Sequence, residues 1–359
     1  MSCKKENFPD KNLHVDEIIN ADGLKFIEIR NSPFDVYGLY DYKNEVDYKR
    51  LPDEIGLNVN EGVSTLYLHT AGGRVRFSTD SRYVAIRVSM PKVSHHSHMP
   101  LTGGAGLDLY IDESEGEEIG FFKTFVPPHN MTSGYESKID LKSKKMRHFT
   151  INMPSYNRVD SLYIGIDENA SLGHGLKYRP LLPVVYYGSS ITQGGCASRP
   201  GNIYQNIISR RLNIDYVNLG FSGSGRGEPL IAEYMATLPM SAFVSDYDHN
   251  APTVEHLENT HFALYETIRA KNPDIPYLMV TRPDYRNHED SEPRRQVILK
   301  SYNDALALGD KNVYFVDGKE FFTGRYADMC TVDGCHPTDL GFSFMADHIG
   351  EALKKALKI

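Results

Sequence analysis

The first half of the chain carries short apolar runs in which hydrophobic and polar positions alternate or nearly so, the pattern of half-buried strands. Turn residues separate the runs, for example at 71–73 and 79–81, and helical periodicity is scarce. The predicted strands lie at 63–68, 75–77, 83–88, 107–111, 149–153 and 161–166. Short strands at this spacing favour an antiparallel, jelly-roll-like β-sandwich.

A loop rich in glycine, proline and polar residues, 171–183, precedes a change of period. Beyond it, short apolar runs alternate with amphipathic helices, the order typical of a parallel sheet covered on both faces. The predicted strands lie at 184–187, 216–219, 242–244, 277–280 and 313–316. Buried helix faces are marked by Ile203, Ile207 and Ile208; Leu257, Leu264, Tyr265 and Ile268; Val297, Ile298, Tyr302 and Ala305; and Phe342, Met345, Ile349 and Leu353. We therefore expect a three-layer α/β/α domain in this half.

Chain length and charge refine this picture. The 359 residues exceed what one hydrophobic core usually supports, which predicts a β-sandwich domain over 1–175 and an α/β domain over 176–359. A net charge of -8, from 39 basic and 47 acidic side chains, disfavours nucleic acid or anionic lipid as a partner. A neutral or small substrate fits better, and the sequence predicts no oligomeric state.

Four scattered cysteines, Cys3, Cys196, Cys330 and Cys335, are too few for a disulfide framework or a four-cysteine zinc site. Reduced thiols are the simplest interpretation, although a bridge between Cys330 and Cys335, or a contact of either with Cys196, stays open. No apolar run reaches the roughly 20 residues of a membrane-spanning helix, and the first residues lack the apolar core of a signal peptide. The sequence as given thus predicts a cytoplasmic protein; an exported lipoprotein trimmed at Cys3 is the alternative.

The candidate chemistry lies just beyond the predicted strands of the second half. Ser190 and Gly223 follow the first two strands, Asn250 lies past the third, and Asp333 and His336 precede the last helix. In open α/β sheets, loops at the carboxyl ends of the strands converge and bind ligands. We therefore expect these five residues to form one site.

Each of these residue types fits a role in acyl transfer. Ser190 is the candidate nucleophile, at the start of a helix where developing negative charge is favoured. His336 would take its proton and return it to the leaving group, with its tautomer fixed by Asp333 three residues earlier. The backbone amides of Ser190 and Gly223 and the side-chain amide of Asn250 would bind the oxyanion. Taken singly, each residue would be ordinary loop or capping chemistry.

These blocks resemble those of SGNH (GDSL-type) hydrolases, in which serine, glycine, asparagine and histidine recur in this order. The correspondence is Ser190, Gly223, Asn250 and His336, with Asp333 completing the triad. In the first half, the segment Gly103–Tyr110 resembles the motif of the GxDLY domain, a β-rich module found ahead of such hydrolases. The two resemblances together cover nearly the whole chain beyond its first few dozen residues.

Two positions depart from the family pattern. Ser189 replaces the aspartate of Gly-Asp-Ser, and Asp248-His249-Asn250-Ala251 replaces the usual Gly-x-Asn-Asp. Neither change removes a catalytic group. The first affects hydrogen bonding around the nucleophile, and the second affects the shape of the acyl pocket.

The metal-like patterns in the chain have simpler interpretations. Asp246, Asp248 and Asn250 resemble the opening of a calcium loop, but Ala251 and Leu257 stand where glycine and the bidentate glutamate belong. The segment 95–98 holds three histidines without a carboxylate or cysteine at ligand spacing, which favours a solvated loop, or one that overhangs the active site. We therefore predict no metal and no cofactor.

The sequence thus predicts a serine esterase. What the resemblance implies is hydrolysis of a small acyl ester, most simply an acetyl group on a carbohydrate, through an acyl-enzyme on Ser190. Lipid acyl esters or thioesters are an alternative substrate class for the same residues. A glycan-binding protein with a decayed hydrolase is the alternative without catalysis.

Overall fold

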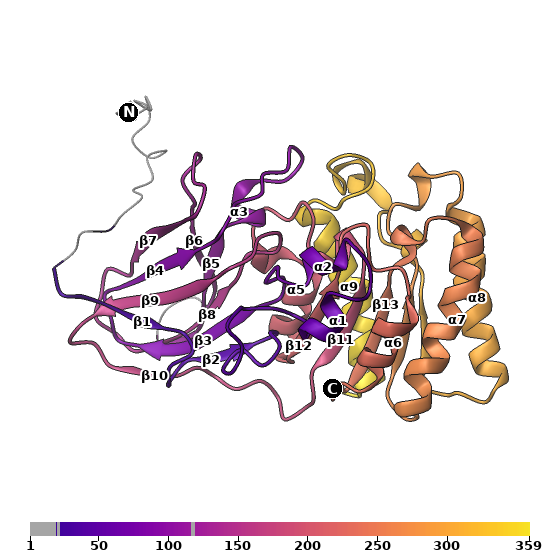
Figure 1. Ribbon diagram of the computed structural model, residues 1–359, viewed down its shortest axis with the longest axis horizontal. Coiled ribbons are helices and arrows are strands. Elements are labelled where there is room, and N and C mark those ends of the chain that lie inside the picture. The colour runs from indigo at the N-terminus through magenta and orange to yellow at the C-terminus, as the bar shows by residue number, and fades with distance from the viewer. Residues whose placement is uncertain (1–18, 20–21, 116–118) are drawn as a thin grey trace.

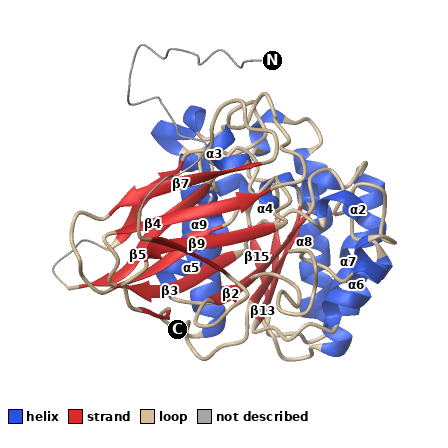
Figure 2. Cartoon of the chain, turned by 60° about the vertical axis from the view of Figure 1, so that its left-hand side comes forward, coloured by secondary structure: helices blue, strands red, loops and turns tan. Residues whose placement is uncertain are grey.

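Two antiparallel sheets build the N-terminal part of the protein in the computed structural model, which describes residues 19, 22–115 and 119–359 (Figures 1 and 2). One sheet has the strand order β1-β9-β4-β7. Its strands are β1 (Leu24–Glu28), β9 (Ser161–Asp167), β4 (Tyr83–Ser89) and β7 (Gly134–Asp140). Its apolar positions, such as Val84, Ile86 and Ile164, belong to one buried cluster that both sheets share.

The second sheet has the order β10-β3-β8-β5-β6, with β2 pairing with β3. Its strands are β10 (Leu172–His174), β3 (Arg74–Thr79), β8 (Arg147–Asn152), β5 (Leu107–Ser114), β6 (Gly120–Phe125) and β2 (Asp35–Tyr37). Val75, Phe77 and Ile151 contribute its side of the shared core. The predicted β-sandwich is confirmed, and alternation of apolar and polar residues identified most of its central strands.

One predicted strand is wrong. Residues 63–68 form helix α2 (Val63–Leu66), which follows α1 (Asp53–Gly56); a third short helix, α3, spans Leu101–Gly104. Val63 and Tyr67, four residues apart, are both buried, as one helical turn requires. They pack in the core of the C-terminal part and not in the sandwich. A six-residue apolar run fits either period, and the packing partner selected the helix.

The C-terminal part is a five-stranded parallel sheet of order β12-β11-β13-β14-β15. Its strands are β11 (Val184–Gly188), β12 (Tyr216–Gly220), β13 (Ala242–Asp246), β14 (Tyr277–Val280) and β15 (Val313–Val316). All five runs predicted from the sequence are present. The register places the ends of β11, β12 and β13 level, with Gly188 opposite Gly220 and Asp246.

Helices cover both faces of this sheet. They are α4 (Ser190–Gln193), α5 (Tyr204–Leu212), α6 (Pro229–Ala236), α7 (Val254–Lys271), α8 (Ser291–Ala307) and α9 (Asp339–Leu357). Short 3₁₀ turns lie at Pro200–Asn202, Asp248–Asn250, Tyr285–Asn287, Gly318–Glu320 and Gly324–Met329. One apolar cluster joins a sheet face to α6, α7 and α8, and another joins the opposite face to α5 and α9. The predicted α/β/α architecture is confirmed; α6, which the sequence pattern did not mark, completes one layer.

A buried arginine ties the two parts together. The Arg50 side chain donates to the carbonyls of Leu66 (2.6 Å) and His69 (2.8 Å). It also donates to those of Asn218 (3.0 Å) and Gly220 (2.7 Å), at the end of β12. Burial lowers the pKa of Arg50 to about 9, so the group stays charged at neutral pH. Its hydrogen bonds therefore fix residues of the N-terminal part against the strand that leads to Gly223.

The GxDLY-like segment makes a second contact between the two parts. Asp108 accepts hydrogen bonds from the backbone N–H of Gly201 (2.8 Å) and from Arg199 (3.2 Å). Arg199 also donates to the Tyr110 hydroxyl. At Gly103, any Cβ would lie 1.9 Å from the carbonyl oxygen of Ala197, so only glycine allows this approach. The motif thus docks the sandwich onto the chain that follows the nucleophile turn.

The predicted boundary at residues 175 and 176 stays a prediction, although the two sheet systems lie on either side of it. The N-terminal cysteine on which the lipoprotein alternative rests, Cys3, lies outside the described residues. Among residues 19, 22–115 and 119–359, no helix is both long enough and apolar enough to span a membrane.

We expect Arg50→Met to lower the free energy of unfolding by at least about 3 kcal/mol, because the methionine leaves buried carbonyls without donors. Denaturant unfolding followed by circular dichroism measures this. The control is Arg82→Met at an exposed arginine, for which a change within about 0.5 kcal/mol is expected. Equal stability of the two variants would show that Arg50 does not hold the parts together.

Candidate active site

The nucleophile candidate sits on a tight turn at the end of β11. All five residues of this strand are buried. At Gly188, a Cβ would lie 2.1 Å from Thr192 Oγ1 and 2.2 Å from the carbonyl oxygen of Asp246, so a side chain has no room. Ser190 begins α4, but this helix has four residues and therefore only a small dipole. The favourable charge at a helix start expected from the sequence is limited to one turn.

Ser189 replaces the family aspartate without loss of the cap. Its Oγ accepts from the N–H of Ile191 at 3.1 Å, and Thr192 Oγ1 accepts from the N–H of Ser189 at 3.1 Å. This reciprocal capping box satisfies two backbone donors that the turn would otherwise leave open. Hydroxyl and carboxylate oxygens are both good N-cap acceptors, which explains why serine serves here.

A chain of hydrogen bonds runs from Ser190 to Asp333. Ser190 Oγ lies 2.9 Å from His336 Nε2, and His336 Nδ1 lies 2.8 Å from Asp333 Oδ2. The other carboxylate oxygen accepts from the backbone N–H groups of Cys335 (3.0 Å) and His336 (2.8 Å). Partial burial raises the pKa of Asp333, but hydrogen bonds from the backbone and ring of His336 outweigh it and lower the pKa to about 2. Asp333 is therefore ionised throughout the neutral range.

The two oxyanion candidates from the other loops lie differently. Gly223 has a φ of +65°, and no heavy atom of the described residues lies within 4 Å of where its Cβ would be. The space next to the Gly223 Cα is thus open, while the Gly223 carbonyl accepts hydrogen bonds from Arg226. Asn250 is nearly buried, and its Nδ2 donates to the carbonyls of Phe221 (2.8 Å) and Gly225 (3.1 Å). Both of its amide hydrogens are therefore engaged in holding the loop that carries Gly223.

Hydrogen bonds connect the four loops that carry Ser190, Gly223, Asn250 and His336. The N–H of Phe221 donates to the carbonyl of Gly188 at 2.9 Å, which links the second loop to the nucleophile turn. Asn250 links the third loop to the second, and His336 links the last loop to Ser190. The structure thus brings together the four loops that sequence spacing assigned to one site.

Tyr156 and His69, both from the N-terminal part, add contacts to the site that the sequence did not identify. The Tyr156 hydroxyl donates to the carbonyl of Ser190 at 2.9 Å. Gln193 Oε1 accepts from the N–H of Ser222 at 2.9 Å, and its Nε2 lies 3.2 Å from His69 Nδ1. Burial, the main cause, lowers the pKa of His69 to about 3, so this ring is neutral. No motif marks Tyr156 or His69, because their partners Ser190 and Gln193 lie far away in the sequence.

The histidine loop at 95–98 reaches the site. The ring centroids of His98 and His336 are 5.1 Å apart, so the expectation that this loop overhangs the active site is confirmed. The Cys196 thiol donates to the carbonyl of His98 at 3.4 Å. Cys196, Cys330 and Cys335 are free thiols, and neither of the bridges left open by the sequence forms among them.

The altered third block is held by ion pairs. Asp248 accepts from the N–H of Arg282 at 3.1 Å and lies 3.6 Å from the Arg294 guanidinium. Its neighbour His249 contacts the buried Asp284 at 2.8 Å. These contacts turn Asp248 toward arginines, in place of the calcium-loop geometry that the spacing superficially resembles.

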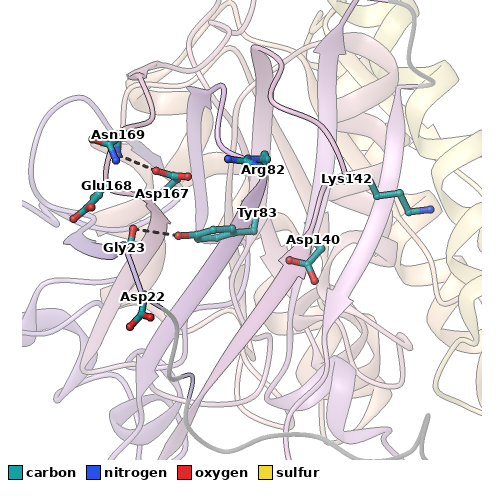
Figure 3. A pocket seen from close by; sticks show the side chains of 9 residues that line it. All are labelled: Asp22, Gly23, Arg82, Tyr83, Asp140, Lys142, Asp167, Glu168 and Asn169. Atoms are coloured by element: carbon teal, nitrogen blue, oxygen red, sulfur yellow. Dashed lines mark hydrogen bonds between the residues drawn. The ribbon is translucent and has the colours of Figure 1, made fainter.

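A separate shallow pocket of about 650 Å³ lies at the other end of the sandwich (Figure 3). It is lined by residues at the start of β4 and the ends of β7 and β9: Asp22, Gly23, Arg82, Tyr83, Asp140, Lys142, Asp167, Glu168 and Asn169. The histidine loop follows the opposite end of β4. The pocket lining pairs no hydroxyl nucleophile with a histidine, so it does not compete with Ser190 as a hydrolytic site.

Comparison with known proteins agrees with this geometry. Residues 182–354 match the GDSL-like lipase/acylhydrolase family, and residues 24–172 match the GxDLY family, described as the N-terminus of SGNH-hydrolase-type esterases. The chain is an SGNH (GDSL-type) ester hydrolase. No curated protein sequence matches it.

Single solved structures match this SGNH hydrolase over its N-terminal and C-terminal parts at once. A Bacteroides ovatus structure described as a GDSL-like lipase has a TM-score of 0.82 at 26% identity, covering 94% of this chain and 98% of its own. A salicylyl-acyltransferase from a tetracycline biosynthetic pathway has a TM-score of 0.73 at 17% identity, over 95% and 99%. A family two carbohydrate esterase from Clostridium thermocellum, solved with cellohexaose, has a TM-score of 0.58 at 15% identity, over 81% and 94%. The last two show the shared fold.

The buried carboxyl of Asp246 supports the nucleophile turn of this SGNH hydrolase and makes the stability of the folded protein depend on pH. Asp246 Oδ2 accepts from the hydroxyls of Thr192 and Tyr204, each at 2.9 Å. Burial outweighs these hydrogen bonds and raises the pKa of Asp246 from 3.8 to about 7. The folded protein therefore holds this proton more tightly than the unfolded chain. Its contribution to stability is full below the unfolded pKa and is lost as the pH rises through the folded pKa.

We expect Asp246→Asn to gain stability relative to the parent protein between pH 5 and pH 8, by more than about 1 kcal/mol, because asparagine keeps an acceptor oxygen without ionising. Urea unfolding at the two pH values measures the difference. Asp140→Asn, at a side chain with 68% exposure, is the matched control. A stability difference for Asp246→Asn that is the same at both pH values would contradict the assignment.

Proposed function

We propose that the protein is a serine esterase that removes small acyl groups, most simply acetyl, from carbohydrate esters. The observation that carries the proposal is the continuous contact of Ser190 Oγ with His336 Nε2 and of His336 Nδ1 with Asp333. Residues 176–359 would carry the reaction. The sandwich at 1–175 would hold the site in place and complete its rim.

The proposed mechanism has two acyl-transfer steps. His336 takes the proton of Ser190 as its oxygen attacks the ester carbonyl, and then gives that proton to the leaving alcohol. Asp333 stays ionised, fixes the ring with the proton on Nδ1 and stabilises the imidazolium that forms. Water, activated by the same histidine, then attacks the acyl-enzyme and releases the acid.

The oxyanion would form beside the nucleophile turn. The backbone N–H of Ser190 and the open backbone at Gly223 supply its donors. For Asn250, one amide hydrogen would have to be shared between a loop carbonyl and the oxyanion, since both are engaged in the free enzyme. Asn250 therefore has two proposed tasks, holding the second loop and binding the developing charge.

The carbohydrate part of the proposal draws on the neighbours with the same two-part architecture. Several of them are named as family two carbohydrate esterases, and two of those structures contain a cello-oligosaccharide. The polar rim formed by the histidine loop is compatible with a sugar. Oligosaccharide esters are therefore the first substrates to test.

A second candidate substrate class has its own observation. Tyr326, Met329 and Val332, which precede Asp333 in the chain, are exposed at 47%, 56% and 48%. Apolar side chains beside the catalytic loop suit a longer acyl chain or a lipid ester. Acyl-chain preference separates the two classes.

We expect Ser190→Ala to lower kcat/KM for p-nitrophenyl acetate by about a thousandfold or more, because it removes the nucleophile. Release of p-nitrophenol measures the rate, and mass spectrometry of the trapped acyl-enzyme locates the acyl group. Ser133→Ala, at an exposed serine of the sandwich, should leave the rate unchanged. An active Ser190→Ala protein would refute the mechanism.

We expect kcat/KM to fall as the acyl chain of the p-nitrophenyl ester lengthens from acetyl to octanoyl, and acetate to be released from acetylated oligosaccharides. The reason is that a small acyl pocket excludes added methylenes. If activity rises with acyl-chain length, the acetylesterase proposal is wrong and the lipid or thioester hydrolase takes its place. Acetate release from free acetylated sugars alone would remove the oligosaccharide part of the proposal.

A further inference from the structure

Three metal-binding side chains meet beside the nucleophile. One ligand atom from each of His98, Cys196 and His336 lies within 4.8 Å of the others. They come from three separate segments: the loop after β4, the chain after the nucleophile turn, and the loop before α9. From the sequence, His98 had no cysteine or carboxylate at ligand spacing, because Cys196 lies almost a hundred residues away.

The contacts within the cluster fix its geometry. The thiol of Cys196 donates to the carbonyl of His98, and the imidazole rings of His98 and His336 are 5.1 Å apart. Cys196 has a φ of +74°, where glycine is the usual residue. The chain thus holds a sulfur at a backbone conformation that disfavours any side chain. Cys196 is buried, whereas both histidines are partly exposed, so an ion has access from solvent on the histidine side.

The nitrogen that His336 offers is the one used in catalysis. Its Nδ1 is bonded to Asp333, so Nε2, which contacts Ser190 Oγ at 2.9 Å, is available to a metal. Asp333 binds the other nitrogen of the same ring, Nδ1. A carboxylate in this position raises the basicity of a metal-bound histidine. A cation at this point would replace the Ser190 proton as the partner of Nε2.

A neighbouring cluster is already satisfied internally. His249, Asp284 and Cys335 also lie within 4.8 Å of one another. However, both Asp284 oxygens contact histidines, His249 at 2.8 Å and His288 at 2.6 Å. The carboxylate there is buried and both of its oxygens already face imidazoles. This cluster serves as the competing site in the experiment below.

We propose that His98, Cys196 and His336 form a binding site for a thiophilic divalent cation such as Zn²⁺, and that its occupancy reversibly blocks ester hydrolysis. Two imidazoles and a thiolate, with a fourth position left for water, are a ligand set typical of zinc. The inhibitory part rests on the proposed function, since it needs His336 as the general base. The binding part stands on the cluster alone.

The binding step balances as follows. The Cys196 S–H bond breaks, its proton passes to solvent, and a Zn–S bond forms while two Zn–N bonds form from imidazole lone pairs. Zinc bonds of roughly 2.0–2.3 Å separate tetrahedral ligand atoms by roughly 3.3–3.7 Å. The ligand atoms now lie within 4.8 Å of one another, and rotation of the His98 and Cys196 side chains can bring them to these shorter distances. With its Nε2 lone pair on the metal, His336 cannot accept the Ser190 proton.

The experiment measures binding and inhibition separately on the full-length protein. Isothermal titration with ZnCl₂ reports binding, and Co²⁺ substitution reports a thiolate ligand through its charge-transfer absorption. Hydrolysis of p-nitrophenyl acetate, with Zn²⁺ added and then removed by EDTA, reports reversible inhibition. Cys196→Gly removes the sulfur and suits the positive φ, and His98→Ala removes the first imidazole.

We expect one Zn²⁺ per chain, loss of activity on saturation and recovery with EDTA. Cys196→Gly and His98→Ala should each weaken Zn²⁺ binding and raise the inhibitory concentration by about 10–100-fold or more. Cys330→Ser and His95→Ala, a thiol and a loop histidine outside the cluster, are the matched controls and should bind as the parent does.

Three results would overturn the proposal: no Zn²⁺ binding, binding that Cys196→Gly leaves unchanged, and binding that Cys335→Ala abolishes in its place. Zinc binding at the cluster without inhibition of an active enzyme would overturn the inhibitory role. An inactive parent protein that still binds Zn²⁺ through Cys196 would sustain the site and reject the esterase function, so the two failures are distinguishable.

Discussion

A buried guanidinium is the interaction on which the catalytic frame depends. Arg50 lies in the N-terminal part, is 2% exposed, and joins carbonyls of its own segment to those of Asn218 and Gly220. Taking a cation out of water is costly, and here carbonyl dipoles and the face of Phe221, 4.6 Å away, offset that cost. Because these carbonyls end β12, the position of the Gly223 loop is set by a residue from outside the α/β domain.

The same relation between the two parts recurs around the nucleophile. Asp108 of the GxDLY-like segment binds the backbone at Gly201, and Tyr156 binds the carbonyl of Ser190. Helices α1 and α2 lie against the core of the α/β part, with Leu51 and Val63 buried in it. The sandwich is thus more than an appended module, because it supplies packing and hydrogen bonds to the loops that carry the candidate site residues.

The nucleophile turn is held by more contacts than the loop with Asp333 and His336. The nucleophile turn is over-determined by a capping box, by Gly188 and by the buried Asp246, so Ser190 is held before any substrate binds. The loop with Asp333 and His336 is more exposed and is fixed mainly by the backbone hydrogen bonds that Asp333 accepts. A firmly held Ser190 opposite a more accessible His336 suits the proposed acyl transfer, and it leaves His336 accessible to the proposed cation.

The sequence by itself identified five sandwich strands, β3, β4, β5, β8 and β9, all five strands of the parallel sheet, and the candidates Ser190, Gly223, Asn250, Asp333 and His336, because strand period and loop position are local properties. It did not identify the sandwich strands β1, β2, β6, β7 and β10. It misjudged residues 63–68, since a short apolar run has no period of its own until it packs. Only the tertiary structure showed that Asn250 donates both amide hydrogens to loop carbonyls. It also placed Cys196 next to His98 and His336. Such contacts join segments distant in the chain, and the packing of the two parts determines which of them form.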